Sequence, residues 1–245
     1  MRILVISDIH ANLSALEAVI QDAGQFDRVW CLGDVVGYGP EPNECVTRLR
    51  EFDITCLAGN HDMAVTGRAP LWDFTPNAQE VIFWTRHWLT DSNHEWLKAL
   101  PDTTLIQEHG ITLVHASPRD PVWEYISERE VAKYNLDFIK TPICLNGHTH
   151  IPLIFRKPWD GMKILEETLR VNTPIRLTGL DLMFINPGSV GQPRDEDPRA
   201  AYAIIDLDEM ILTHHRVQYD VSATQKLMKQ AKLPDRLIRR LRFGQ

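Results

Sequence analysis

The stretch RILVISDIHAN, residues 2–12, is a short apolar run that is rich in β-branched residues and ends in polar ones. Two later stretches, RVWCLGD (28–34) and ITCLAGN (54–60), have the same form. Between the first two lies LSALEAVIQDAG (13–24), whose apolar residues recur at helical spacing. This alternation predicts βαβ units, and near-continuous apolar strands are typical of a sheet that is covered on both faces.

The polar residues that end these three runs share one kind of position. Asp8, Asp34 and Asn60 stand at the carboxyl ends of the predicted strands. In α/β proteins, ligands bind at that edge of the sheet. We therefore expect these three side chains to face a common site.

The composition is that of an ordinary globular protein. The chain has 245 residues, of which 44% are hydrophobic and 24% are charged, enough to bury a full core, and we interpret residues 1–245 as one domain. No run approaches the roughly 18 apolar residues of a membrane span, and Met1 leads directly into the first predicted strand. These features predict a cytoplasmic protein that does not bind membranes.

Cysteine spacing and net charge exclude two further classes. The four cysteines include no C-x-x-C pair, so we expect buried thiols and neither a zinc knuckle nor a disulfide framework. The formal net charge of -7 argues against stable nucleic-acid binding and disfavours a nuclease. The cysteines are Cys31, Cys45, Cys56 and Cys144.

The second half of the chain reads as more antiparallel. Thr75-Pro76 predicts one helix start, and Ser92 with Glu95 forms the pattern of a second. Two β-rich runs around His109-Gly110 predict a hairpin in residues 103–116 that ends near His115. Further strands are expected within residues 142–150, 151–157, 180–190, 200–207 and 211–220.

A closing helix is expected from Ser222 to about Arg242, with a strongly basic composition. Its single acid is Asp235. A solvated basic face and a docking surface are both consistent with this pattern, and a homo-oligomer stays open. The basic residues are Lys226, Lys229, Lys232, Arg236, Arg239, Arg240 and Arg242.

Histidines accompany the strand-end acids. In Asp8-Ile9-His10, residues two apart on a strand point the same way, so both side chains could reach one metal ion. His148-Thr149-His150 repeats this spacing with two imidazoles. Each motif alone fits a loop or a capped helix. Together with His115 and residues 59–62 (GNHD), they favour a metal site over a structural role.

The ordered motifs DIH (8–10), GD (33–34), GNHD (59–62), a single histidine and GHTH (147–150) resemble the calcineurin-like metallophosphoesterase superfamily. The later NPGSVGQPRD (186–195) is similar to its small bacterial and archaeal phosphodiesterases. This resemblance implies an α/β fold, a four-layer α/β/β/α sandwich in which helices flank two mixed sheets.

The resemblance also implies the role of each motif residue. Asp34 bridges two metal ions, His61 acts on the departing oxygen, and Asp62 orients His61. One metal is bound by Asp8, His10 and His150, and the other by Asn60, His115 and His148. Many relatives have glycine where this chain has Ala11, and we expect little effect because alanine tolerates most backbone geometries except a positive φ.

The predicted reaction is hydrolysis of a small phosphate ester, nucleotides included. Two divalent transition-metal ions about 3.5–4 Å apart would activate a bridging hydroxide. The donor set suits manganese, iron, nickel, cobalt and zinc alike, and manganese is the metal that we expect first. Asn12 and Arg194 are candidates to contact the phosphoryl oxygens, although Asn12 also fits a helix cap and Arg194 a partner of Asp195. We interpret Ser189 as a turn residue.

The sequence leaves the substrate open. Trp72, Phe74, Trp123 and Tyr125 fall in predicted loops, where they could stack on a base or pack the protein's edge. Diester and monoester hydrolysis are both compatible with the motifs, as is a dinucleoside polyphosphate or a phosphoprotein substrate. A non-catalytic binding scaffold is the alternative from another class, and the presence of His61 argues against it.

Overall fold

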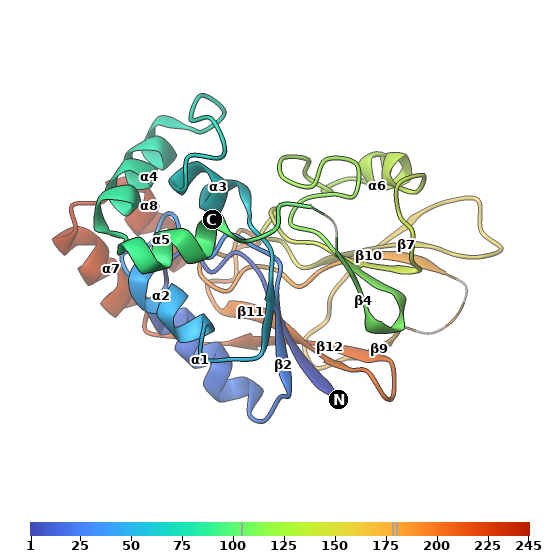
Figure 1. Cartoon of the computed structure of the whole chain (residues 1–245). Helices are drawn as coiled ribbons and strands as arrows, with labels where there is room; N and C mark the ends of the chain where they lie inside the picture. The colour runs from blue at the N-terminus through green and yellow to red at the C-terminus, as the bar shows by residue number, and fades with distance from the viewer. Residues whose placement is uncertain (104, 178, 180) are drawn as a thin grey trace.

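Two six-stranded sheets form the centre of the molecule (Figure 1). The computed structural model describes residues 1–103, 105–177, 179 and 181–245. The first sheet has the order β3 (Ile54–Cys56), β2 (Arg28–Cys31), β1 (Arg2–Ile6), β11 (Ala200–Asp206), β12 (Ile211–Val217) and β9 (Pro174–Arg176). The second has β4 (Leu105–Gln107), β5 (Ile111–Leu113), β6 (Ile143–Leu145), β10 (Leu182–Asn186), β7 (Leu153–Lys157) and β8 (Leu165–Thr168).

Both sheets are mixed, and each has a parallel half. Strands β1, β2 and β3 are mutually parallel, and β11, β12 and β9 continue that sheet with antiparallel pairing. In the second sheet β5, β6 and β10 are parallel, while β4, β7 and β8 pair antiparallel. The parallel halves matter for function because their carboxyl ends carry the predicted site residues.

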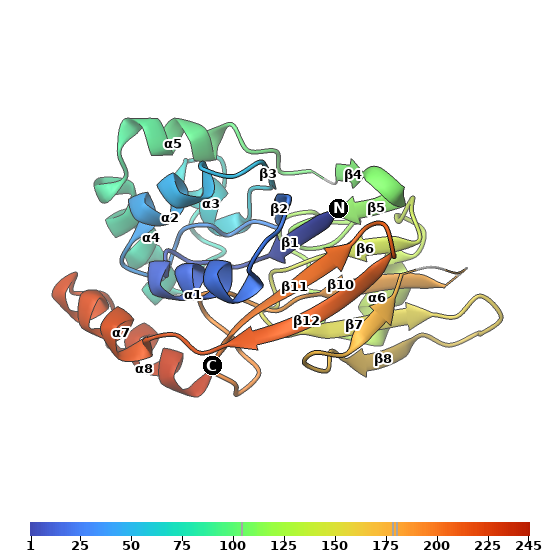
Figure 2. The same cartoon turned by 90° about the horizontal axis from the view of Figure 1, so that it is seen from below.

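Helices cover the two outer faces (Figures 1 and 2). The helices beside the first sheet are α1 (Leu13–Ala23), α2 (Pro42–Leu49), α3 (Asn60–Val65), α4 (Pro76–Trp88) and α5 (Asp91–Lys98), and α6 (Arg129–Asn135) lies on the second sheet. The C-terminal α7 (Val221–Gln230) and α8 (Asp235–Arg240) pack against α4, and two 3-10 turns span Glu108–Gly110 and Leu241–Phe243. No helix in the described part of the chain is long and apolar enough to cross a membrane.

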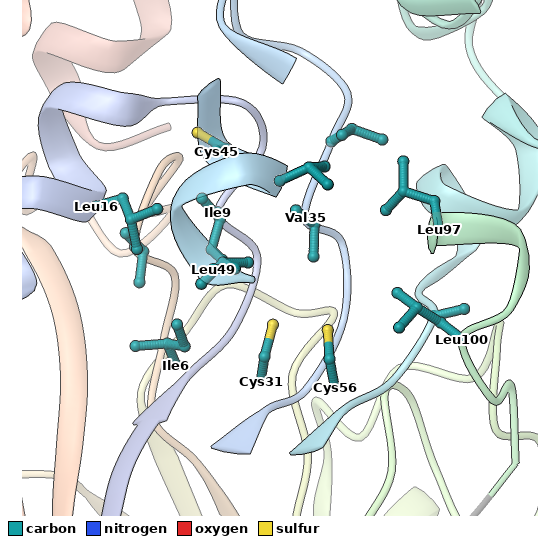
Figure 3. Close-up of a cluster of buried hydrophobic side chains, with 14 of the residues drawn as sticks. Ile6, Ile9, Leu16, Cys31, Val35, Cys45, Leu49, Cys56, Leu97 and Leu100 are labelled. Carbon is teal, nitrogen blue, oxygen red and sulfur yellow. The ribbon is translucent and has the colours of Figure 1, made fainter. Parts of the chain in front are cut away.

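The alternation of side chains along β1 explains the layering. Ile3 and Val5 point into the core between the two sheets, whereas Leu4 and Ile6 point into the core beneath the helices. Figure 3 shows Ile6 with Cys31 in this second core. Strand β1 therefore buries both faces, as its near-continuous apolar sequence predicted. The expected α/β/β/α sandwich of two mixed sheets is confirmed.

Two predicted helix boundaries are wrong. Helix α5 is capped by Thr90, whose side chain accepts a hydrogen bond from the Asn93 N–H, so Ser92 lies inside the helix. The single closing helix is two helices: Lys232 has a φ of 57° and Pro234 follows before α8 begins. Proline cannot continue the hydrogen-bond ladder of a preceding helix, and this explains the break.

Other predicted elements are present. Thr75 caps α4, and β4 and β5 form the antiparallel hairpin before His115. Thr104 and Leu180, which fall within predicted strand segments, lie outside the described residues. Strands β8 and β9 were not predicted, because exposed residues such as Glu166 give β8 no apolar alternation.

All four cysteines are buried and free, as predicted. Cys31 and Cys56 lie opposite each other on β2 and β3, and Figure 3 shows both surrounded by apolar side chains. Burial raises the pKa of Cys45 and of Cys144, which disfavours the reactive thiolate. We expect dithionitrobenzoate to modify the native protein very slowly and to titrate four thiols after unfolding in guanidinium. A thiol that reacts rapidly in the native protein would contradict this core.

Candidate metal centre

The predicted ligands converge where the parallel halves of both sheets end. Two groups of buried side chains have ligand atoms that lie within 4.8 Å of one another. Asp34 belongs to both groups. The first contains Asp8, His10, Asp34 and His150, and the second contains Asp34, His115 and His148.

The backbone that presents these residues is not extended. φ is 53° at Asp8, 49° at His10 and 54° at Asp34, and it is 66° at His148 and 63° at His150. The argument from strand alternation is therefore wrong, because these residues lie in left-handed turns beyond the strand ends. Asp8 and His10 nevertheless belong to one group, as predicted, whereas His148 and His150, also two residues apart, belong to different groups.

Ala11 also adopts a left-handed conformation, with a φ of 51°. We expected little effect from alanine provided that φ was negative, and the structure does not meet that condition. Its side chain is fully buried. Because an L-residue with a Cβ is disfavoured in this region, the surrounding packing must hold the turn.

Asp34 lies between the two groups. Its Oδ1 accepts a hydrogen bond of 2.9 Å from the His61 N–H, which fixes the carboxylate. Its Oδ2 lies 3.7 Å from His10 Nε2 and 3.6 Å from His115 Nε2. One carboxylate oxygen thus faces a histidine of each group at nearly equal distance.

Asp8 is held in the same manner. Its Oδ2 accepts a hydrogen bond of 3.1 Å from the His148 N–H. Its Oδ1 is buried without a hydrogen-bond donor and lies 3.4 Å from His150 Nε2. A buried carboxylate oxygen without a donor is costly unless a positive charge stabilises it.

Backbone carbonyls determine which nitrogen carries the proton in the first group. His10 Nδ1 lies 3.2 Å from the Val36 oxygen, and His150 Nδ1 lies 2.6 Å from the Gln192 oxygen. Since a carbonyl can only accept, both Nδ1 atoms donate, and each neutral ring keeps its lone pair on Nε2. These two Nε2 atoms are 3.1 Å apart.

The second group follows the same rule. His115 Nδ1 donates to the Leu32 oxygen at 2.9 Å, so its Nε2 lone pair faces Asn60 Oδ1 at 3.3 Å. His148 donates through Nε2 to the Trp123 oxygen at 3.2 Å and keeps its lone pair on Nδ1. Asn60 thus joins the second group.

A bound cation would relieve the repulsion among these lone pairs. Imidazole nitrogens, carboxylate oxygens and one amide oxygen suit a divalent transition metal, and their other hydrogen bonds fix the rings as in known metal sites. Burial raises the pKa of Asp8 to about 7 and also raises the pKa of Asp34, while it lowers the pKa of His10 and His150. A bound dication would favour the ionised carboxylates and neutral rings that bind it.

His61 lies beside the first group, but Asp62 does not orient it. Asp62 accepts backbone N–H bonds from Val35 at 3.2 Å, Val36 at 3.0 Å and Gly59 at 3.0 Å, so this prediction is wrong. The carboxylate fixes the loop after β2 and the start of α3 instead.

Aromatic rings hold the His61 imidazole. Its centroid lies 4.3 Å from that of Tyr38 and 5.0 Å from those of Phe74 and His10. Its Nδ1 is buried without a hydrogen-bond partner. This packing positions the ring but does not determine which of its two nitrogens carries the proton.

Asn12 has a structural role. Its Oδ1 accepts from the Ala15 N–H at 3.2 Å and from Thr224 Oγ1 at 3.1 Å, and its Nδ2 donates to the Gly191 oxygen at 2.9 Å. It is the buried N-cap of α1 and joins that helix to α7. These bonds favour the helix-cap alternative over a substrate contact.

Arg194 stands closer to the ligands. Its N–H donates to the His150 oxygen at 3.4 Å, and Nη2 donates to Gln192 Oε1 at 3.0 Å. The expected alternative, a pair with Asp195, does not form because Asp195 pairs with Arg216. The guanidinium therefore has no carboxylate partner among the described residues.

Ser189 has the predicted turn role. Its Oγ donates to the Asp8 oxygen at 2.7 Å and accepts from the Gln192 N–H at 2.8 Å. Sequence reasoning did not identify Tyr38, whose ring contacts His10 at 4.7 Å between centroids. The four carbonyls that fix the histidine rings were also missed, since backbone acceptors carry no residue-type signal.

A two-sheet sandwich with buried acid and histidine groups at its strand ends is the arrangement of a metal-binding α/β protein. Residues 1–210 match the model of the calcineurin-like phosphoesterase superfamily domain. The chain belongs to the calcineurin-like phosphoesterase superfamily. This family uses divalent metals, and the buried acid and histidine cluster provides ligands for them.

Relatives of known sequence or structure support this assignment. A metallophosphoesterase from Sphaerobacter thermophilus has 44% identity and a TM-score of 0.90, with 100% of this chain and 99% of that chain covered. An uncharacterised protein of Methanocaldococcus jannaschii is 36% identical over 99% of this chain and 98% of its own length. A symmetrical bis(5'-nucleosyl)-tetraphosphatase of Nitrosococcus oceani is 25% identical, over 69% of this chain and 65% of its own.

Gly59 offers a test of the Asp34 position. A Cβ at Gly59 would lie 2.1 Å from Asp34 Oδ1, while its φ of -90° suits alanine. We expect Gly59→Ala to displace the carboxylate and to lose most of the bound divalent metal, measured by inductively coupled plasma mass spectrometry after gel filtration. Full metal content in this variant would contradict the assigned geometry.

Gly67→Ala is the matched control for that experiment. Gly67 has a φ of 77° and open space around its Cβ position. Alanine there should cost roughly 1–2 kcal/mol of stability through backbone strain. It should nevertheless retain the metal, and thermal unfolding of both variants would separate loss of stability from loss of ligands.

Proposed function

We propose that this protein is a metal-dependent phosphoric ester hydrolase that holds two divalent ions, manganese foremost. The observation that carries the proposal is the position of Asp34 Oδ2, 3.7 Å from His10 Nε2 and 3.6 Å from His115 Nε2. A single carboxylate oxygen between two sets of lone pairs suits two ions better than one. Superfamily membership supports the same reaction class.

Each metal would be held by one set of side chains. Asp34 would be shared between them. When bound, the two ions would supply an activated water and neutralise charge on the phosphoryl group. The first set is Asp8, His10 and His150, and the second is Asn60, His115 and His148.

The chain's own residues would orient the substrate and donate a hydrogen bond to its leaving oxygen. Arg194 is half-buried, bonded to Gln192 and free of carboxylate partners among the described residues, so it can donate to phosphoryl oxygens. His61 is held against Tyr38 and Phe74 and would act at the leaving oxygen. Burial and the charge of Arg194 lower the pKa of His61, which favours the neutral ring as a hydrogen-bond donor.

Phosphomonoesters and phosphodiesters, nucleotides included, are the proposed substrates. The likeness to a bis(5'-nucleosyl)-tetraphosphatase supports including dinucleoside polyphosphates. Every proposed ligand and His61 are present and buried, which argues against a non-catalytic scaffold.

Metal removal tests the proposed reaction. We expect metal-stripped protein to be inactive toward bis-p-nitrophenyl phosphate and p-nitrophenyl phosphate, with initial rates restored by manganese and to differing extents by nickel, cobalt or zinc. Asp34→Ala should lose activity by about 100-fold or more, because both ion sites lose a ligand. Asp137→Ala, an exposed control, should behave as wild type. Activity without metal would refute the proposal.

The role of His61 predicts a dependence on the leaving group. Loss of a general acid or donor costs about 10²–10⁴-fold, and the cost rises with the pKa of the departing alcohol. We expect His61→Ala to hydrolyse alkyl diesters far more slowly than wild type and p-nitrophenyl diesters only moderately more slowly. The readout is the slope of log kcat/KM against leaving-group pKa, with the exposed His87→Ala as control. Equal slopes would assign His61 a different role.

A further inference from the structure

A cavity of about 1010 Å³ opens beside the metal centre. We call it the arginine pocket. Four arginines and two tyrosines line it and matter for the argument: Arg194, Arg236, Arg239, Arg240, Tyr38 and Tyr125. Its volume is at the upper end of the roughly 300–1,000 Å³ typical of pockets for organic ligands.

The floor of the pocket touches the metal ligands. Tyr38 packs edge-on against His10 at 4.7 Å between centroids, and Tyr125 stacks on His148 at 3.9 Å. The Arg194 N–H donates to the oxygen of His150. A phosphate ester bound at the metal centre would therefore extend along this floor.

The positive charge of the pocket is largely unpaired. Among the described residues, Arg194, Arg236 and Arg240 form no ion pair with an aspartate or glutamate. Arg239 has only Asp235, at 3.8 Å and highly exposed. In a chain with a net charge of -7, such a cluster marks a place where an anion is preferred.

Two of these guanidinium groups repel each other. Arg194 Cζ and Arg240 Cζ lie 5.7 Å and 5.9 Å from the centroid of the same Tyr38 ring. Burial and the charge of Arg194 lower the pKa of Arg240 to about 10. Arg194 Nε is buried without an acceptor, and Arg240 bonds the main-chain oxygen of Gln245. A bound anion would relieve both the repulsion and the missing acceptor.

We infer that the arginine pocket binds a second phosphoryl group of the substrate, so that the preferred substrates are organic polyphosphates and not simple monophosphate esters. The inference rests on the proposed phosphoesterase function and names its substrate class. The Tyr125 ring lines the pocket and is 47% exposed, so an aromatic part of such a substrate can stack on it. The metal centre would hold the phosphoryl group that is cleaved, and the arginines would hold the next one.

The C-terminal segment creates this pocket. Helix α8 lies beyond residues 1–210, the part that matches the family model. The break before α8 at Pro234 lets three of its arginines line the same pocket as Tyr38 and Arg194. The pocket is therefore a feature added to the phosphoesterase core, suited to choosing substrates.

Binding of unreactive phosphonates to the metal-loaded full chain tests the inference. Methylphosphonate, methylenebisphosphonate and bis(phosphonomethyl)phosphinate carry one, two and three phosphoryl-like groups without a hydrolysable ester. Isothermal titration calorimetry should show the longer ligands binding about tenfold tighter or more than methylphosphonate. In Arg236→Gln/Arg240→Gln this preference should shrink about tenfold, and in Arg242→Gln, an exposed residue outside the pocket, it should persist.

The outcomes separate this inference from the proposed function. Chelation of free metal by the phosphonates is equal for all variants, so a preference that survives in the double variant overturns the pocket assignment. A preference lost in the double variant supports it, even if aryl phosphate hydrolysis fails and refutes the proposed reaction. If the protein hydrolyses phosphate esters, the ratio of kcat/KM for ADP to kcat/KM for p-nitrophenyl phosphate should fall in Arg236→Gln/Arg240→Gln. The same ratio should be unchanged in Arg242→Gln.

Discussion

The convergence of uncompensated lone pairs at the strand ends is the constraint on which this structure depends. His10 Nε2 and His150 Nε2 face each other at 3.1 Å, and each ring donates its Nδ1–H to a backbone carbonyl. Buried acceptors in contact destabilise a fold unless a cation lies among them. A metal ion among these lone pairs would relieve their repulsion, so metal affinity and folding stability are expected to be coupled.

Close backbone approach keeps these ligands in place. A Cβ at Gly147 would lie 1.9 Å from Ser7 Oγ, and one at Gly191 would lie 1.8 Å from the Ile9 oxygen. Glycine is required at such contacts because no other residue fits between the loops. The loops that follow the strands of the two sheets therefore pack closely against one another. Asn12, at the start of α1, adds hydrogen bonds to Gly191 and Thr224. Precision at the metal centre comes from this packing of loops against one another.

The sequence predicted the composition of the site well and its local geometry less well. Acids and histidines at strand ends beside glycines predicted the cluster, since parallel strands deliver their carboxyl ends to one edge. Alternation failed because Asp8 and His148 lie in left-handed turns. The predicted role of Asp62 failed because its carboxylate is oriented by three backbone N–H groups and not by His61. Carbonyl partners of the rings depend on loop packing, which residue types do not encode.

In the basic C-terminal segment, one helix break changes where the positive charges lie. A continuous helix would have spread its lysines and arginines around a solvated surface, the simplest interpretation of the sequence. The break at Pro234 instead places Arg236 and Arg240 in the lining of the same cavity as Arg194, with Asp235 beside them. Because the arginines outnumber this acid, their mutual repulsion raises the energy of the pocket, and a bound anion would lower it. The shared core would then determine the reaction, while a short terminal helix determines which phosphate esters reach it.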